Sequence, residues 1–88
     1  MAASLRDVTE RLALTVIYEP VEDGWVQARI EELPGVITAG PSTEEAKELL
    51  LDALREYLLA LGKEMEDVDL DPPRADATRE PLEISLTA

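Results

Sequence analysis

The residue types that carry out most protein chemistry are scarce in this sequence. It has no histidine and no cysteine, so it offers neither a histidine base nor a thiolate nucleophile. Its serines, Ser4, Ser42 and Ser85, have no base that the sequence places beside them. Because the chain has no cysteine, disulfide chemistry is excluded as well. We therefore expect no catalytic residue and no cofactor.

Acidic side chains form a pattern that is similar to the beginning of a metal-binding loop. Asp67, Asp69 and Asp71 alternate as the first ligands of a calcium loop do. Such a loop needs glycine at its sixth position and glutamate at its twelfth, where this chain has Pro72 and Thr78. We interpret the three aspartates as solvated loop charge and expect no metal site.

The chain of 88 residues is strongly acidic, with 8 lysines and arginines, 20 acidic residues and a formal net charge of −12. Nucleic acids are bound through clustered positive side chains, so no nucleic-acid binding is expected of this chain alone. The charge favours either solubility or a basic protein partner. No apolar run is long enough to cross a membrane, and the N-terminal residues lack a signal-peptide core. These features indicate a cytoplasmic protein without membrane contact.

Alternating apolar residues predict an antiparallel hairpin early in the chain. Residues 11–19 alternate as a strand does, and residues 25–30 alternate again after a turn at 20–24. In the second strand Trp25 falls on the face opposite to Val26, Ala28 and Ile30. A short third strand is expected over 36–39.

The best-defined element is a helix that begins after Ser42 and ends at Gly62. Ser42 and Glu45 have the spacing of a capping box. Apolar residues then recur with the spacing of one helical face, at Ala46, Leu49, Leu50, Ala53, Leu54, Tyr57, Ala60 and Leu61. Leu51 and Leu58 lie on the shoulder of this stripe, which indicates either a contact between copies or a wide core stripe.

The rest of the chain completes a single α+β domain over residues 1–88, with residues 1–10 as an N-terminal extension. The acidic segment 63–80 predicts a long loop, and residues 82–87 alternate as a final strand. The expected architecture is a two-layer β-β-β-α-β fold with three antiparallel strands and one helix over one face. The third strand and the helix would lead into a parallel fourth strand by a right-handed crossover. The other face, with Ile17 and Trp25, would need water, a second copy or a partner.

Residues 18–61 resemble the HicB antitoxin family. The matching residues are Gly24-Trp25, Leu33-Pro34-Gly35, Thr38, Gly40, Ser42 to Ala46, Leu54 and Tyr57-Leu58. The resemblance implies a truncated, partial ribonuclease-H-like fold, whose element order agrees with the predicted one. Many members of the family have cysteine where this chain has Val36, a position that looks like small-residue packing.

The resemblance also implies a protein partner. HicB-like antitoxins neutralise HicA-type toxins, which are small basic ribonucleases that cleave messenger RNA with a histidine. An acidic antitoxin can cover the surface that would otherwise hold RNA phosphates. Family members often continue into an operator-binding domain, for which this sequence offers no basic helix. A ribonuclease H active site is not expected either, because the first strand has no acid before Glu19.

Two groups of acids are candidates for the toxin-facing surface. One lies around the hairpin, and the other in the late loop, which includes Glu64, Glu66 and Asp67. Charge fixed on strands beside an apolar anchor binds better than charge on a loop, because less order is lost on binding. We therefore predict toxin contacts at Glu22, Asp23, Trp25, Glu31, Glu32 and Leu33, with Glu19 nearby.

Self-association into a dimer or tetramer is also expected. The candidate contacts between copies are Ile17, Trp25, Leu51, Leu54 and Leu58. A different class of function is compatible with the same sequence, namely a stand-alone oligomeric binding or scaffold module that has no toxin partner. A short, basic, histidine-containing protein encoded by the neighbouring reading frame would favour the antitoxin.

Overall fold

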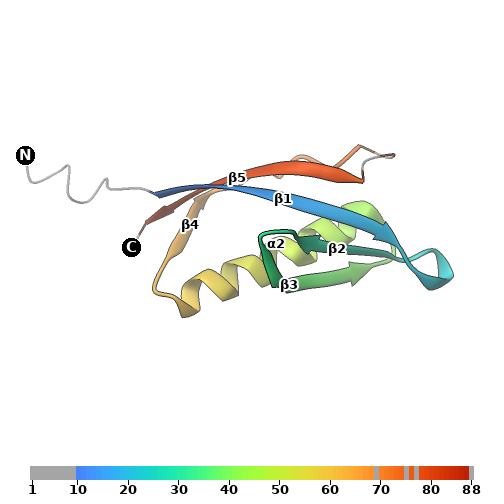
Figure 1. Ribbon diagram of the computed structural model, residues 1–88, viewed down its shortest axis with the longest axis horizontal. Helices are drawn as coiled ribbons and strands as arrows, with labels where there is room; N and C mark the ends of the chain where they lie inside the picture. The colour runs from blue at the N-terminus through green and yellow to red at the C-terminus, as the bar shows by residue number, and fades with distance from the viewer. Residues whose placement is uncertain (1–9, 69, 75, 77, 88) are drawn as a thin grey trace, which may run out of the picture.

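A curled antiparallel sheet and one α-helix form a small α+β domain in the computed structural model, which describes residues 10–68, 70–74, 76 and 78–87 (Figure 1). The five strands have the order β3-β2-β1-β5-β4. In chain order the elements are β1 (Glu10–Pro20), the short 3-10 turn η1 (Glu22–Gly24), β2 (Val26–Ile30), β3 (Leu33–Gly40), α2 (Thr43–Ala60), β4 (Glu64–Asp67) and β5 (Arg79–Thr87).

The predicted hairpin is confirmed as β1 and β2, which pair antiparallel with Val16 opposite Ile30. Its tip is closed by a hydrogen bond from the Val21 N–H to the Trp25 carbonyl, 2.8 Å, and by one from the Trp25 N–H to the Glu22 carbonyl, 3.2 Å. Asp23 and Gly24 both have positive φ, 63° and 78°. These are the left-handed conformations that aspartate and glycine accept in turns, so the tip is a defined structure.

The predicted helix ends are confirmed as well. The Ser42 hydroxyl accepts a hydrogen bond from the Glu45 N–H at 3.1 Å. At the other end Gly62 has φ 79°, and the Lys63 N–H bonds back to the Leu58 carbonyl. A left-handed glycine followed by a residue whose N–H bonds to a carbonyl of the last helical turn is a Schellman motif.

The helix presents a different face to the sheet from the predicted one. Its buried residues are Ala46, Lys47, Leu50, Leu51, Leu54 and Leu58. Leu49 and Tyr57, which were expected in the core, are exposed, whereas Leu51 and Leu58 are only 7% and 2% exposed. Of the two interpretations left open for Leu51 and Leu58, the burial favours a core stripe. The core lies between α2 and the sheet face that carries Val16, Ile30, Leu82, Ile84 and Leu86.

The joint between β3 and α2 is packed closely. A Cβ placed on Gly40 would lie 2.9 Å from the Ala46 nitrogen. The Thr38 hydroxyl donates to the Ala46 carbonyl at 3.0 Å. Because Thr38, Gly40 and Ser42 all serve this joint, three of the residues that resemble the HicB family have a structural role here.

Two expectations about the C-terminal part are wrong. The segment 63–80 was expected to be a loop, but it contains the strand β4, which pairs with the end of β5. The final strand was expected to be parallel, but every pairing in the sheet as described is antiparallel, and β5 lies beside β1. The extra strand reverses the chain once more before β5, which removes the parallel crossover.

Candidate functional site

The sheet face opposite the helix is largely polar, and most of its charged side chains form ion pairs with one another. Three ion pairs connect neighbouring segments there: Arg29 to Glu19 at 3.3 Å, Arg79 to Glu31 at 2.6 Å and Arg11 to Glu83 at 3.0 Å. Ile17 lies on this face with Arg29 and Arg79 as cross-strand neighbours, and it is buried. The face is therefore compatible with water and does not by itself require a partner.

Glu32 belongs to the same face and is held by β1. Its carboxylate accepts hydrogen bonds from the Thr15 N–H at 2.7 Å and from the Thr15 hydroxyl at 2.9 Å. The slight burial of Glu32 acts to raise its pKa, but the hydrogen bonds from Thr15 and from its own N–H, together with the positive charge of Arg79, lower the pKa below its ordinary value. The Glu32 carboxylate thus accepts a hydrogen bond from a backbone N–H of β1 at a point beyond the end of β2.

The predicted toxin-binding residues do not form one cluster. Glu22, Asp23 and Trp25 lie before β2, whereas Glu31, Glu32 and Leu33 lie after it. A strand rises about 3.4 Å per residue, so the two groups are about 20 Å apart. Glu31 and Glu32 are already bonded within the fold, and Leu33 packs against the core. The hairpin tip is the half of the predicted set that is open to a partner.

At the hairpin tip, two large apolar side chains are exposed next to two carboxylates. Trp25 is 45% exposed and Val21 is 43% exposed, and with Glu22 and Asp23 they line a shallow hollow. No ion pair of Glu22 or Asp23 is found among the described residues. The two backbone hydrogen bonds that close the turn hold this surface in place. We call these four residues the hairpin-tip patch.

Most of the residues predicted to contact a second copy are covered by the chain itself. Leu51, Leu54 and Leu58 are buried against the sheet, and Ile17 is buried between arginines on the other face. Trp25 is the exposed member of that set. In this fold the four buried residues present little surface to another molecule.

The outer face of α2 carries acids that the sequence reasoning missed. Glu45, Glu48, Asp52 and Glu56 recur at helical spacing opposite the buried stripe, and all are exposed. Arg55 lies 3.8 Å from Asp52 and is the basic residue of this face. The helical spacing of these acids is visible in the sequence and is the signal that identifies this face. Much of the negative charge is therefore presented by the helix.

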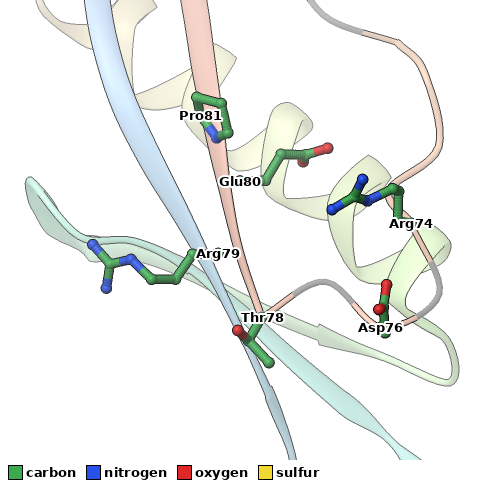
Figure 2. Close-up of a pocket in the computed structure, with 6 residues that line it drawn as sticks. All are labelled: Arg74, Asp76, Thr78, Arg79, Glu80 and Pro81. Atoms are coloured by element: carbon green, nitrogen blue, oxygen red, sulfur yellow. The ribbon is translucent and has the colours of Figure 1, made fainter.

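Figure 2 shows a second hollow, where the chain enters β5, with Glu80 directed toward the helix and Arg79 away from it. The hollow is lined by Arg74, Asp76, Thr78, Arg79, Glu80 and Pro81. The Glu80 carboxylate accepts a hydrogen bond from the Tyr18 hydroxyl at 2.8 Å and pairs with the Lys47 ammonium at 3.2 Å. Lys47 is only 3% exposed and also donates to the Asp71 carbonyl at 2.7 Å. This network fastens the segment before β5 to the helix and is structural.

The possible calcium loop can be placed only in part. Asp69 lies outside the described residues, and among the described ones no group of three side chains could hold a metal ion.

No helix in the described part of the chain is long and apolar enough to cross a membrane. Comparisons with protein-family models, curated proteins and solved structures found no match. The similarity to HicB antitoxins is therefore a hypothesis that rests on the quoted residues.

Proposed function

We propose that this protein is a HicB-like antitoxin domain with a partial ribonuclease-H-like fold, which works in the cytoplasm without catalysis. It binds a small basic HicA-type toxin and covers the surface with which that toxin holds RNA. The fold supports this proposal through three antiparallel strands followed by a capped helix on one face. The antiparallel β5 and the additional β4 are departures from the expected order, and both lie after the segment that carries the resemblance.

The hairpin-tip patch is the observation that carries the proposal. Exposed tryptophan is enriched at the centres of protein interfaces, where it fills a pocket of the partner. In this chain Trp25 stands beside Glu22 and Asp23 on a closed turn. Because the turn is already ordered, binding costs little conformational entropy there. A basic partner would place cations on the two carboxylates and an apolar side chain on Trp25.

The helix acids give the same partner long-range attraction. Glu45, Glu48 and Glu56 are exposed, and no basic side chain among the described residues forms an ion pair with them. Carboxylates that keep their full charge speed the diffusional approach of a cation, and salt screens the effect. We therefore assign anchoring to the hairpin-tip patch and steering to the outer face of α2.

Charge reversal at two sites tests the anchoring. The double variant E22K/D23K should slow association with the basic protein encoded by the neighbouring reading frame, and Trp25→Ala should speed dissociation. The effect of E22K/D23K should shrink in high salt. Glu31 and Glu32 are unsuitable for this test, because their replacement would break bonds within the fold.

The matched control is E64K/E66K on β4, which makes the same change in net charge away from the hairpin. Binding would be measured by surface plasmon resonance, and protection of messenger RNA from the toxin would be measured with the same proteins. A larger loss of binding in E64K/E66K than in E22K/D23K would contradict the assigned surface. A basic neighbour that does not bind at all would contradict the function and favour the stand-alone module.

A further inference from the structure

The two outer strands of the sheet differ in how they are protected. An unpaired edge invites pairing with another chain, and proteins usually blunt it with charge. β4 consists of Glu64, Met65, Glu66 and Asp67, so three of its four residues are acidic. β3 (Leu33–Gly40) is the one strand of the five without a charged residue, and it lies in the longest uncharged stretch of the sequence, 33–43.

The free edge of β3 presents main-chain groups of Ile37 and Ala39. Glu31 directly follows β2, and its N–H bonds to the Thr15 carbonyl of β1. The odd-numbered residues of β2 therefore direct their main-chain groups toward β1. The even-numbered residues of β2 direct theirs toward β3, where Ala28 is opposite Thr38. Ile37 and Ala39 therefore direct their N–H and C=O groups away from the sheet. Ile37 is also 45% exposed on the open face.

A second copy fits this edge with two-fold symmetry. If Thr38 of one copy lies opposite Thr38 of the other, then Ile37 of each copy pairs with Ala39 of the other copy. Each of these pairs exchanges both of its hydrogen bonds, as alternate pairs in an antiparallel ladder do. On the open face a large side chain then lies beside a small one at both positions, which suits close packing.

The helix contributes a second contact on the other face of the sheet. Leu49, Ala53 and Tyr57 are spaced four residues apart and form one ridge, on which Leu49 and Tyr57 are exposed. The opposite shoulder, with Leu51, faces the segment 70–73, so the ridge lies toward β3. The helix packs mainly on β3 and, after it, on β2. Because paired strands are about 4.8 Å apart, two such helices would lie about 10 Å apart, a normal packing distance.

We propose that the protein forms a symmetric dimer in which β3 pairs antiparallel with β3 of a second copy about Thr38, joining two sheets into one. A second copy fits this edge better than a basic partner does, because the edge has no charge to attract one. Two chains with a net charge of −12 each repel one another elsewhere, and a neutral edge is where they can approach. Salt should therefore strengthen this dimer, whereas it weakens binding of a basic protein.

Matched variants of the whole chain test the pairing by sedimentation velocity. Ala39→Pro removes one outward N–H from each copy and no bond to β2, so the dimer should weaken about thirtyfold while the fold persists. Ala39→Ser keeps that N–H and should leave the dimer unchanged. Ile37→Lys places like charges at the seam and should weaken the dimer by at least tenfold. Gln27→Lys adds the same charge on the open face of β2 and should strengthen the dimer slightly by reducing net repulsion.

Amide hydrogen exchange gives a readout that a change in folding alone would not produce. The Ile37 and Ala39 amides should become protected as protein concentration rises, and they should lose that protection on dilution. If Ala39→Pro fails to fold, as judged by circular dichroism, Ile37→Lys and the exchange data decide. A wild-type chain that is monomeric at high micromolar concentration would overturn the proposal. So would a dimer in which these two amides exchange freely and Ile37→Lys has no effect.

Discussion

Single side chains in this protein divide into those that stabilise the fold and those that are left for a partner. Glu32 belongs to the first kind, because its carboxylate holds both the N–H and the hydroxyl of Thr15. Glu22 belongs to the second kind and has no ion pair among the described residues. The sequence shows both as turn glutamates beside a strand, and only their surroundings distinguish them.

The bonds of Glu32 should appear in the pH dependence of stability. Its pKa is lowered in the folded state, so its contribution is present above the unfolded pKa of about 4.3 and is lost as pH falls through the folded pKa. Glu32→Gln should therefore destabilise the protein at neutral pH, by less than about 1 kcal/mol because water screens an exposed carboxylate. The difference from wild type should shrink as pH falls below the unfolded pKa, and it should vanish below the lowered pKa of the folded state.

The matched control for Glu32→Gln is Glu22→Gln, which removes the same charge from a side chain without a described hydrogen bond. Denaturant unfolding at several pH values would measure both variants. Subtracting the control removes the general relief of repulsion that acidification brings to so acidic a chain. If the two variants show the same pH dependence, Glu32 does not have the role described.

At the scale of elements, the joint between β3 and α2 leaves no room for a side chain at Gly40. Gly40 has the Ala46 backbone within 2.9 Å of where a Cβ would lie, and a backbone cannot move aside as a flexible side chain can. Gly40→Ala should therefore destabilise the protein by roughly 1 to 3 kcal/mol. Gly35→Ala is the control, because nothing lies within 4 Å of its Cβ position. It should be neutral or stabilising by up to about 1 kcal/mol.

Thermal or denaturant unfolding of the two glycine variants provides the comparison. A Gly40→Ala protein as stable as wild type would show that the joint can open without cost. The same result would remove the structural explanation for one of the residues that resemble the HicB family.

Elements with strong local signals could be predicted from the sequence, and those without them could not. The helix cap at Ser42 and the stop at Gly62 depend on neighbouring residues, and both were found correctly. β4 was missed because a bulge after Met65 shifts the alternation, so that Met65 and Val68 both pack toward the core. The strict period of two that identifies a strand is broken there.

The rotation of the helix was harder to predict, since its apolar residues cover more than one face. Leu49, Leu50 and Leu51 are consecutive, and periodicity alone does not say which of them meets the sheet. The Lys47 ion pair with Glu80 and the close approach of Ala46 to Gly40 fix that rotation. Both are tertiary contacts, so periodicity alone could not decide whether Leu51 and Leu58 belong to a core stripe or to a contact between copies.

At the scale of the whole molecule, most basic residues form ion pairs within the chain. Arg11, Arg29, Lys47, Arg55, Lys63 and Arg79 each form an ion pair with an acid of the same chain. With 8 basic residues and 20 acidic ones, most acids are left to face solvent. Among the described residues, acids without an ion pair lie on the outer helix face, at the hairpin tip and along β4, while the β3 edge is neutral. This division gives a basic partner and a second copy separate surfaces.

Fluorine NMR of the chain labelled with fluorotryptophan tests the central claim most directly, because Trp25 is the only tryptophan. The label would be followed while the basic protein from the neighbouring reading frame is added at low and at high salt. We expect a saturable shift of the Trp25 signal, with weaker binding at high salt. Binding that leaves the Trp25 signal unchanged would contradict the assignment of the hairpin tip as the surface that holds the toxin.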